Sequence, residues 1–134
     1  MTIRSRGELR GCLGRLQTSD RLWVMVADLA ASVADSDPRF EPVALTELPD
    51  IEIEVSVLGP ERPVLSIDEI EPGRHGLIVE LGVHRGLLLP QVAVEQGWDR
   101  ETFVSQTCRK AALPPDAWRQ GARVFMFEAL VFHD

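Results

Sequence analysis

The chain has 134 residues and a mass of 14.9 kDa, a size typical of one domain whose core needs no disulfide or metal. Its formal net charge is −7, which disfavours nonspecific nucleic-acid binding, because that binding needs a basic surface. No apolar run approaches the length of about 18 residues that a membrane span requires, and residues 1–10 lack the apolar stretch of a signal peptide. We therefore expect a cytoplasmic protein without a membrane segment.

The first half of the chain predicts two strands and one helix. Apolar residues recur at helical spacing over residues 21–36, and Pro38 ends this helix because the residue before a proline avoids the α region. Three residues just before the helix have side chains that commonly cap an N-terminus: Thr18, Ser19 and Asp20. Strands are expected over residues 9–16, which two glycines loosen, and over residues 51–58, where apolar and polar residues alternate.

The second half predicts a hairpin, a helix and a buried strand. The hairpin has strands over residues 77–81 and 86–89, joined by a loop of four residues. Asp99 is expected to cap a helix over residues 100–112. Residues 124–132 are apolar on both faces, which indicates a strand in the middle of a sheet. Short helical segments are expected over residues 66–70 and 90–96.

This order of elements predicts an α+β fold: a mainly antiparallel sheet flanked by helices, in a single domain over residues 1–134. Two cysteines, Cys12 and Cys108, are too few for a disulfide framework, and Cys108 is expected in the core. Thirteen arginines stand against one lysine, Lys110, which we attribute to the base composition of a GC-rich bacterial genome.

Short motifs occur along nearly the whole chain in a fixed order. Residues 9–14 read LRGCLG, which differs by one isosteric residue from LRGCIG. The further motifs are DPRF at 37–40, IEIEVSVL at 51–58, RHG at 74–76, LLPQVA at 88–93, GWD at 97–99 and TCRKA at 107–111. Together these segments resemble the AMMECR domain family.

The resemblance implies partner proteins more than it implies a reaction. In prokaryotes, proteins similar to this one are encoded with a Memo-like protein and a radical SAM protein, as the A component of the AmmeMemoRadiSam set. Family members usually carry a further helix and strand ahead of the first motif, and we expect either that this chain lacks both or that its start codon lies upstream of Met1. The chain has no Cx₃Cx₂C motif, so it is not itself the radical SAM protein.

Cys12 is the first candidate for chemistry. Gly11 and Gly14 beside it would let a ligand approach the backbone closely, and Arg10 would share its face in an extended strand. A guanidinium at that position would stabilise a thiolate, the nucleophilic form of cysteine. The alternative is that Cys12 is a small buried residue and that the glycines only allow tight packing.

His75 lies in a predicted turn, where it could act as a general base towards Cys12 or as a polar contact in a pocket. The alternative is a turn histidine that bonds its own backbone. Glu52 and Glu54 share a strand face and could form an acid–base pair, of which Glu54 is retained as a binding candidate, although such pairs are usually solvated. Two further histidines are expected to be solvated: His84 and His133.

Two functions follow from these residues. The favoured one is a binding or adaptor module that presents a groove around residues 9–14 to a small molecule, or to Memo-like and radical SAM partners. The alternative is a thiol-dependent enzyme with Cys12 as nucleophile, Arg10 as electrostatic aid and His75 as base. Nucleic-acid binding is a weaker hypothesis because of the net charge of −7, and its only support is a group of four arginines: Arg4, Arg6, Arg10 and Arg15. No short metal-ligand spacing and no nucleotide-binding motif occurs, so no metal or cofactor is expected.

Overall fold

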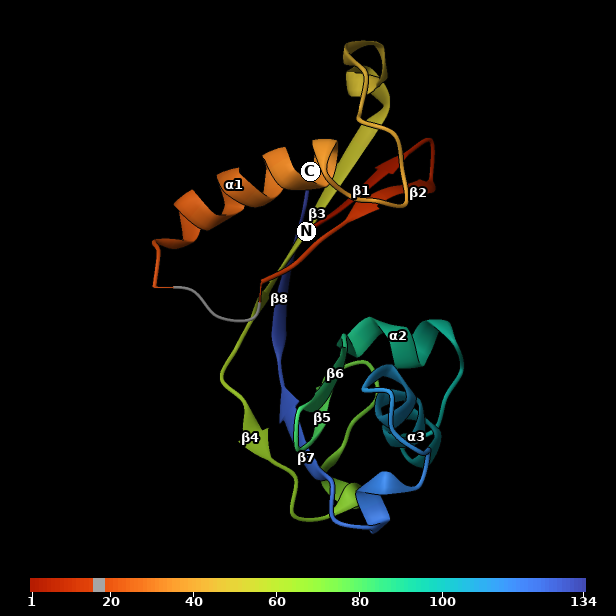
Figure 1. Ribbon diagram of the computed structural model, residues 1–134. Helices are drawn as coiled ribbons and strands as arrows, with labels where there is room; N and C mark the ends of the chain where they lie inside the picture. The colour runs from red at the N-terminus through yellow and green to blue at the C-terminus, as the bar shows by residue number, and fades with distance from the viewer. Residues whose placement is uncertain (16–18) are drawn as a thin grey trace. The chain divides into compact units, whose positions relative to one another are not determined.

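The structure, a computed structural model, describes residues 1–15 and 19–134. The chain forms two compact units, a first unit of Met1–Val57 with Val131–Asp134 and a second unit of Leu58–Leu130. Each unit combines antiparallel strands with helices (Figure 1), which confirms the predicted α+β class. Within the described residues, no helix is long and apolar enough to cross a membrane.

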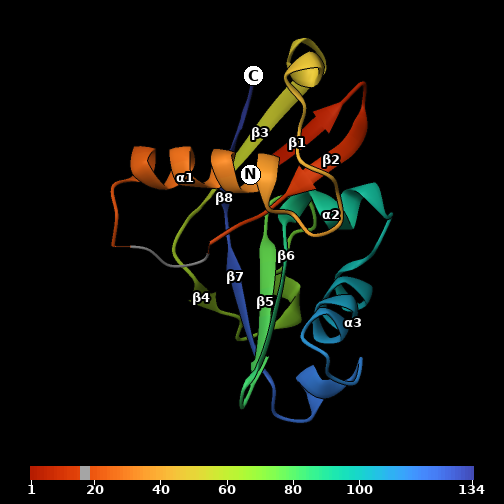
Figure 2. The same ribbon diagram turned by 45° about the horizontal axis from the view of Figure 1, so that its top comes forward.

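The first unit is built on a sheet with the strand order β2-β1-β3-β8. Its elements are β1 (Thr2–Ser5), β2 (Glu8–Cys12), α1 (Leu22–Asp35), the short helical turn η1 (Leu45–Asp50), β3 (Ile51–Leu58), which ends one residue beyond the unit, and β8 (Ala129–His133), which belongs to the unit from Val131 onwards. Strand β1 pairs antiparallel with both β2 and β3. Helix α1 packs beside the hairpin of β1 and β2 (Figure 2), and buries Leu29 and Val33 there.

Two predictions in this unit need correction. Strand β2 ends at Cys12, so the strand expected over residues 9–16 is shorter, and residues 16–18 lie outside the described residues. Arg21 occupies the N-cap position of α1 and makes no side-chain cap bond, so Ser19 and Asp20 do not hold that position. The helix nevertheless ends at Asp35, before Pro38, as predicted.

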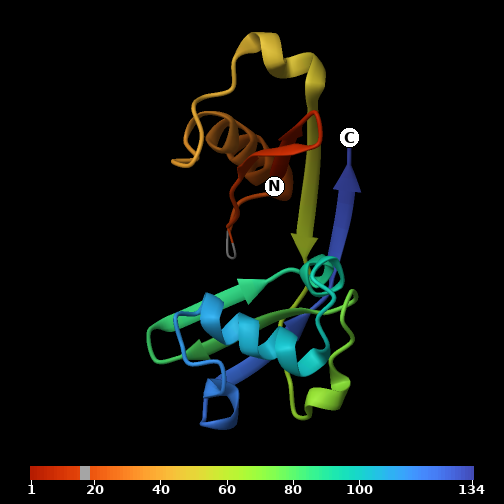
Figure 3. The same cartoon turned by 90° about the vertical axis from the view of Figure 1, so that its right-hand side faces the viewer.

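The second unit is built on a sheet with the strand order β4-β7-β5-β6. Its elements are β4 (Arg62–Pro63), the helical turn η2 (Ile67–Glu69), β5 (Gly76–Leu81), β6 (His84–Leu88), α2 (Pro90–Glu95), α3 (Arg100–Lys110), the turn η3 (Ala117–Arg119) and β7 (Arg123–Phe127). Helix α3 packs against β5 and β6, and Figure 3 shows it in front of these strands. Asp99 Oδ1 accepts a hydrogen bond from Thr102 N at 2.8 Å, so Asp99 caps α3 as predicted.

A continuous apolar core fills this second unit. Phe103, Val104 and Cys108 of α3 are 0–1% exposed and pack with Leu77 and Val79 of β5. Cys108 is therefore a core residue, as expected, and burial raises the pKa of its thiol.

The hairpin and the last apolar run differ from their predictions. The turn between β5 and β6 has two residues rather than four, which places His84 in β6. The run over residues 124–132 forms two strands, β7 and β8, which separate at Glu128. Strand β8 ends the order of the first sheet and leaves Leu130 66% and Phe132 57% exposed, so it is not a central strand. The charged Glu128 lies within this otherwise apolar run and marks the interruption, and the second half of the run then joins a different sheet.

Candidate functional site

The LRGCLG motif begins on β2, where the ladder with β1 is irregular. Leu9 and Gly11 pair with consecutive residues of β1, so Arg10 between them is an extra residue, which makes a β-bulge. A bulge interrupts the regular alternation of side chains. The prediction that Arg10 and Cys12 share one face depends on that alternation, which does not hold here.

Gly11 is required where helix α1 packs on β2. A Cβ atom at this position would lie 2.7 Å from the carbonyl oxygen of Val33 and 2.9 Å from its side chain. The structure thus supports the packing explanation for Gly11. Gly14 differs, because a Cβ atom there would meet no described atom within 4 Å.

Arg10 binds the segment that follows α1. Its guanidinium donates to both carboxylate oxygens of Glu47, at 2.8 and 3.0 Å, and to the carbonyl oxygens of Glu41 and Pro42 at 2.7 and 3.2 Å. Glu47 also accepts from the backbone N–H of Ala44 at 2.9 Å. The bonds from Arg10, and then from Ala44, lower the pKa of Glu47 to about 2. Arg10 therefore ties β2 to η1.

Cys12 is held by a second ion pair, between Asp37 and Arg39. The Cys12 N–H donates to Asp37 Oδ2 at 2.9 Å, and Arg39 Nη2 donates to the Cys12 carbonyl oxygen at 3.0 Å. Arg39 also binds Asp37 through two side-chain nitrogens, Nε at 2.9 Å and Nη2 at 2.7 Å. This is the two-pronged geometry that makes arginine–carboxylate pairs strong.

The Asp37 carboxylate is 2% exposed, and Arg39 and the Cys12 N–H hold its pKa well below the usual range. The pKa of Arg39 is raised, chiefly by Asp37 and also by the side chain of Cys12. Cys12 itself is half-buried, with its Sγ 3.2 Å from Thr2 Oγ1. The sequence predicts Arg10 as the arginine beside Cys12, but the guanidinium that hydrogen-bonds Cys12 is that of Arg39, and it binds the carbonyl oxygen.

Asp37, Arg39 and Glu47 were absent from the predicted site. The DPRF motif was used only as evidence for the family resemblance. Its Asp37 and Arg39 are two residues apart, a spacing that allows an ion pair. Glu47 carries no local signal, because its partner Arg10 lies 37 positions away.

His75 belongs to the second unit, whereas Cys12 belongs to the first. The His75 side chain is 4% exposed, and its Nδ1 accepts a hydrogen bond from the N–H of Glu71 at 3.1 Å. Its Nε2 has no hydrogen-bond partner among the described residues, and lies 3.9 Å from Glu128 Oε1. This geometry is that of a turn histidine bonded to its own backbone. A catalytic pair of Cys12 and His75 stays a prediction.

Glu54 lies two strands from Cys12 in the same sheet, because Thr2 of β1 pairs with both residues. Glu54 is on β3, with its Oε2 3.7 Å from Nδ1 of the exposed His133. Over residues 1–15 and 19–134, no group of three or more His, Cys, Asp or Glu side chains is arranged to hold a metal ion.

Comparison with known proteins gives a family match over almost the entire chain. The family model AMMECR1 matches residues 1–132. A protein of Methanothermobacter thermautotrophicus is 46% identical over 142 residues, which cover 100% of this chain and 73% of that protein. Protein MJ0810 of Methanocaldococcus jannaschii is 45% identical over 134 residues, covering 95% of this chain and 67% of that protein.

A solved structure is similar as well. The crystal structure of the uncharacterized protein PH0010 from Pyrococcus horikoshii matches with a TM-score of 0.90 and 41% sequence identity, covering 99% of this chain and 71% of that one. The relatives named here are archaeal, so the bacterial source inferred from the arginine content stays a prediction.

Proposed function

Because the chain belongs to the AMMECR1 family, we propose that it is a cytoplasmic binding module that contacts Memo-like and radical SAM partners through the surface around its LRGCLG motif. The observation that carries this proposal is that two arginines near the motif are engaged in ion pairs within the unit. Arg10 and Arg39, the two arginines bonded to the motif and to the segment after α1, are bound to Glu47 and Asp37. Their role in this arrangement is to hold the motif and the following segment in one conformation, which reduces the ordering cost of binding.

Exposed apolar residues support a protein partner. The turn η1, which Arg10 ties to β2, leaves Leu45 84% and Leu48 56% exposed, and Leu9 of the motif is 40% exposed. Exposed leucines on elements that ion pairs hold in place are suited to bury against another protein.

The test is binding to purified Memo-like and radical SAM proteins from the same genome, measured by titration calorimetry. Replacing both Leu45 and Leu48 by Asp is expected to weaken binding by about tenfold or more, because it removes apolar contacts and adds buried charge. Val83→Asp is the matched control, since Val83 is 95% exposed on the β5–β6 turn of the second unit. Unchanged affinity of the double variant, with its circular dichroism spectrum intact, would refute the proposal.

A thiol-dependent enzyme is the second candidate, and one contact favours it: the Arg39 guanidinium donates to the carbonyl oxygen of the half-buried Cys12, which brings a positive charge close to that residue. Iodoacetamide labelling of the folded protein, followed by mass spectrometry, tests this candidate. The enzyme hypothesis predicts that Cys12 is labelled faster than a cysteine in a short peptide and that Arg39→Gln slows the labelling. Cys108 is the internal control, because it is 0% exposed and should react only after unfolding. Labelling of Cys12 at the peptide rate, unaffected by Arg39→Gln, would exclude an activated thiol. The proposed role of His75 as a base towards Cys12 would then also be excluded.

A further inference from the structure

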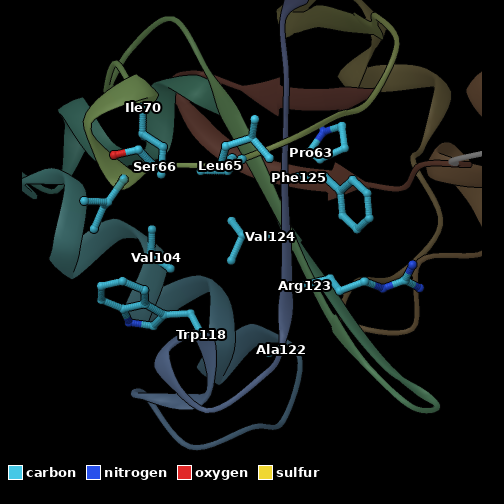
Figure 4. Close-up of a pocket in the computed structure, with 12 residues that line it drawn as sticks. Pro63, Leu65, Ser66, Ile70, Val104, Trp118, Ala122, Arg123, Val124 and Phe125 are labelled. Carbon is cyan, nitrogen blue, oxygen red and sulfur yellow. The ribbon is translucent and has the colours of Figure 1, made fainter.

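A pocket of about 460 Å³ opens on the second unit, where the short strand β4 ends. It is bounded by the segment that follows β4, by η2, α3 and η3, and by β7 (Figure 4). Small-molecule sites in proteins commonly have volumes of about 300–1,000 Å³ and mainly apolar walls. The size of this pocket therefore fits a small organic molecule.

The inner wall of the pocket is apolar. Ile70, Val104 and Ala122 are 0–8% exposed, and Val124 and Trp118 add further apolar surface. A charged group placed against this wall would lose its hydration without gaining a partner there.

Arg123 is the charged side chain among the residues that line the pocket, and its charge is balanced by an ion pair. Its guanidinium pairs with Glu80 and lies 5.6 Å from the centre of the Phe125 ring. Figure 4 shows Arg123 and Phe125 on the side of β7 away from Trp118. The pocket thus offers no strong attraction for an anion.

Trp118 gives the pocket an aromatic wall that is held in place. The Arg119 guanidinium lies 4.5 Å from the centre of the Trp118 ring, and Arg119 Nη2 donates to Glu101 Oε2 at 2.9 Å. The half-buried indole also packs against the apolar core of the unit, and this packing restricts it before any ligand arrives. A fixed indole favours a planar partner that can stack or pack edge-on against it.

We infer that this pocket is a binding site for a small, uncharged, aromatic molecule. The site belongs to the second unit and uses none of the residues assigned above to the partner surface or to the thiol hypothesis. Leu65, which is 88% exposed, lies among the lining residues and would be partly covered by the ligand.

The probe for this site is N-phenyl-1-naphthylamine, an uncharged aromatic dye that fluoresces when it leaves water. Saturable binding to one site of the full chain is expected, and Trp118→Leu should raise the Kd by about tenfold because the aromatic wall is lost. Trp23→Leu is the matched control, since Trp23 is 68% exposed in the first unit, and it should leave the Kd unchanged. The anionic dye 8-anilinonaphthalene-1-sulfonate should bind more weakly than the uncharged dye.

A second pair of variants covers the case in which Trp118→Leu does not fold. Leu65→Glu places a charge at the mouth of the pocket on an exposed residue, and should raise the Kd several-fold. Val83→Glu makes the same change at a residue that is 95% exposed and does not line the pocket, and should have no effect. The inference is overturned by unsaturable binding, by equal effects of the two Glu variants, or by tighter binding of the anionic dye.

Discussion

The two units of this chain are stabilised by different means. In the second unit, α3 buries a continuous apolar cluster against the sheet, with Phe103 and Val104 at its centre. In the first unit, α1 buries only Leu29 and Val33, and two arginine–carboxylate pairs fix the segment that follows it. The unit with fewer buried apolar side chains is thus the one in which the sequence motif is held by ion pairs. It is also the unit in which we propose the partner surface.

The units share one packing device. A Cβ atom at Gly11 would lie 2.7 Å from the backbone oxygen of Val33, and one at Gly86 would lie 2.3 Å from the backbone nitrogen of Ala111. In both units a glycine on a strand lets a helix, or the end of one, approach the strand backbone directly. What differs between the units is therefore the side-chain chemistry around the contact.

The largest expected effect is in the apolar core of the second unit. Phe103→Ala should lower the free energy of unfolding by about 3–5 kcal/mol, because it removes a fully buried ring and leaves a cavity. Urea unfolding followed by circular dichroism measures this loss. Leu45→Ala, at a residue 84% exposed in the first unit, should change the value by less than about 0.5 kcal/mol. An equal loss of unfolding free energy in the two variants would show that Phe103 is not a core residue.

A smaller effect is expected where α1 meets β2. Gly11→Ala should cost about 1–3 kcal/mol, because the new methyl group overlaps the backbone of Val33. Gly14→Ala is the matched control from the same motif and should be within about 0.5 kcal/mol of the unchanged chain, since nothing described lies within 4 Å of its Cβ position. The same unfolding measurement separates the two. If Gly11→Ala were tolerated as well as Gly14→Ala, the close packing of α1 on β2 would be refuted.

The smallest effect is the pH dependence of the first unit. The pKa of Glu47 is about 2 in the folded chain, against an ordinary value of 4.5, so the unfolded chain binds more protons between these pH values. The stability that Glu47 contributes is therefore fully present above about pH 4.5 and is lost as the pH falls towards about 2. The lowered pKa of Asp37 acts in the same direction.

Glu47→Gln should flatten the fall in melting temperature between pH 5 and pH 2, as measured by thermal unfolding. Glu8→Gln, an exposed residue of β2, is the control and should keep the slope of the unchanged chain. An unchanged slope in Glu47→Gln would mean that the bond with Arg10 is not maintained in solution.

Local patterns in the sequence were sufficient to predict several elements. The alternation over residues 51–58 gave β3 with its observed bounds, and Asp99 caps α3 as its position indicated. The proline at position 90 begins α2. These elements depend on residues a few positions apart, and both the period of a strand and the chemistry of a cap act over that distance.

Only the tertiary structure decided the environment of the motif. Arg10 bonds Glu47 across 37 positions, and Arg39 bonds Cys12 across 27. The bulge at Arg10 interrupts the alternation from which a shared face for Arg10 and Cys12 was predicted. A hydrophobic period shows which side of an element is buried, but it does not encode which of many distant carboxylates an arginine will bind. That choice is made when the fold brings one of them within hydrogen-bonding distance.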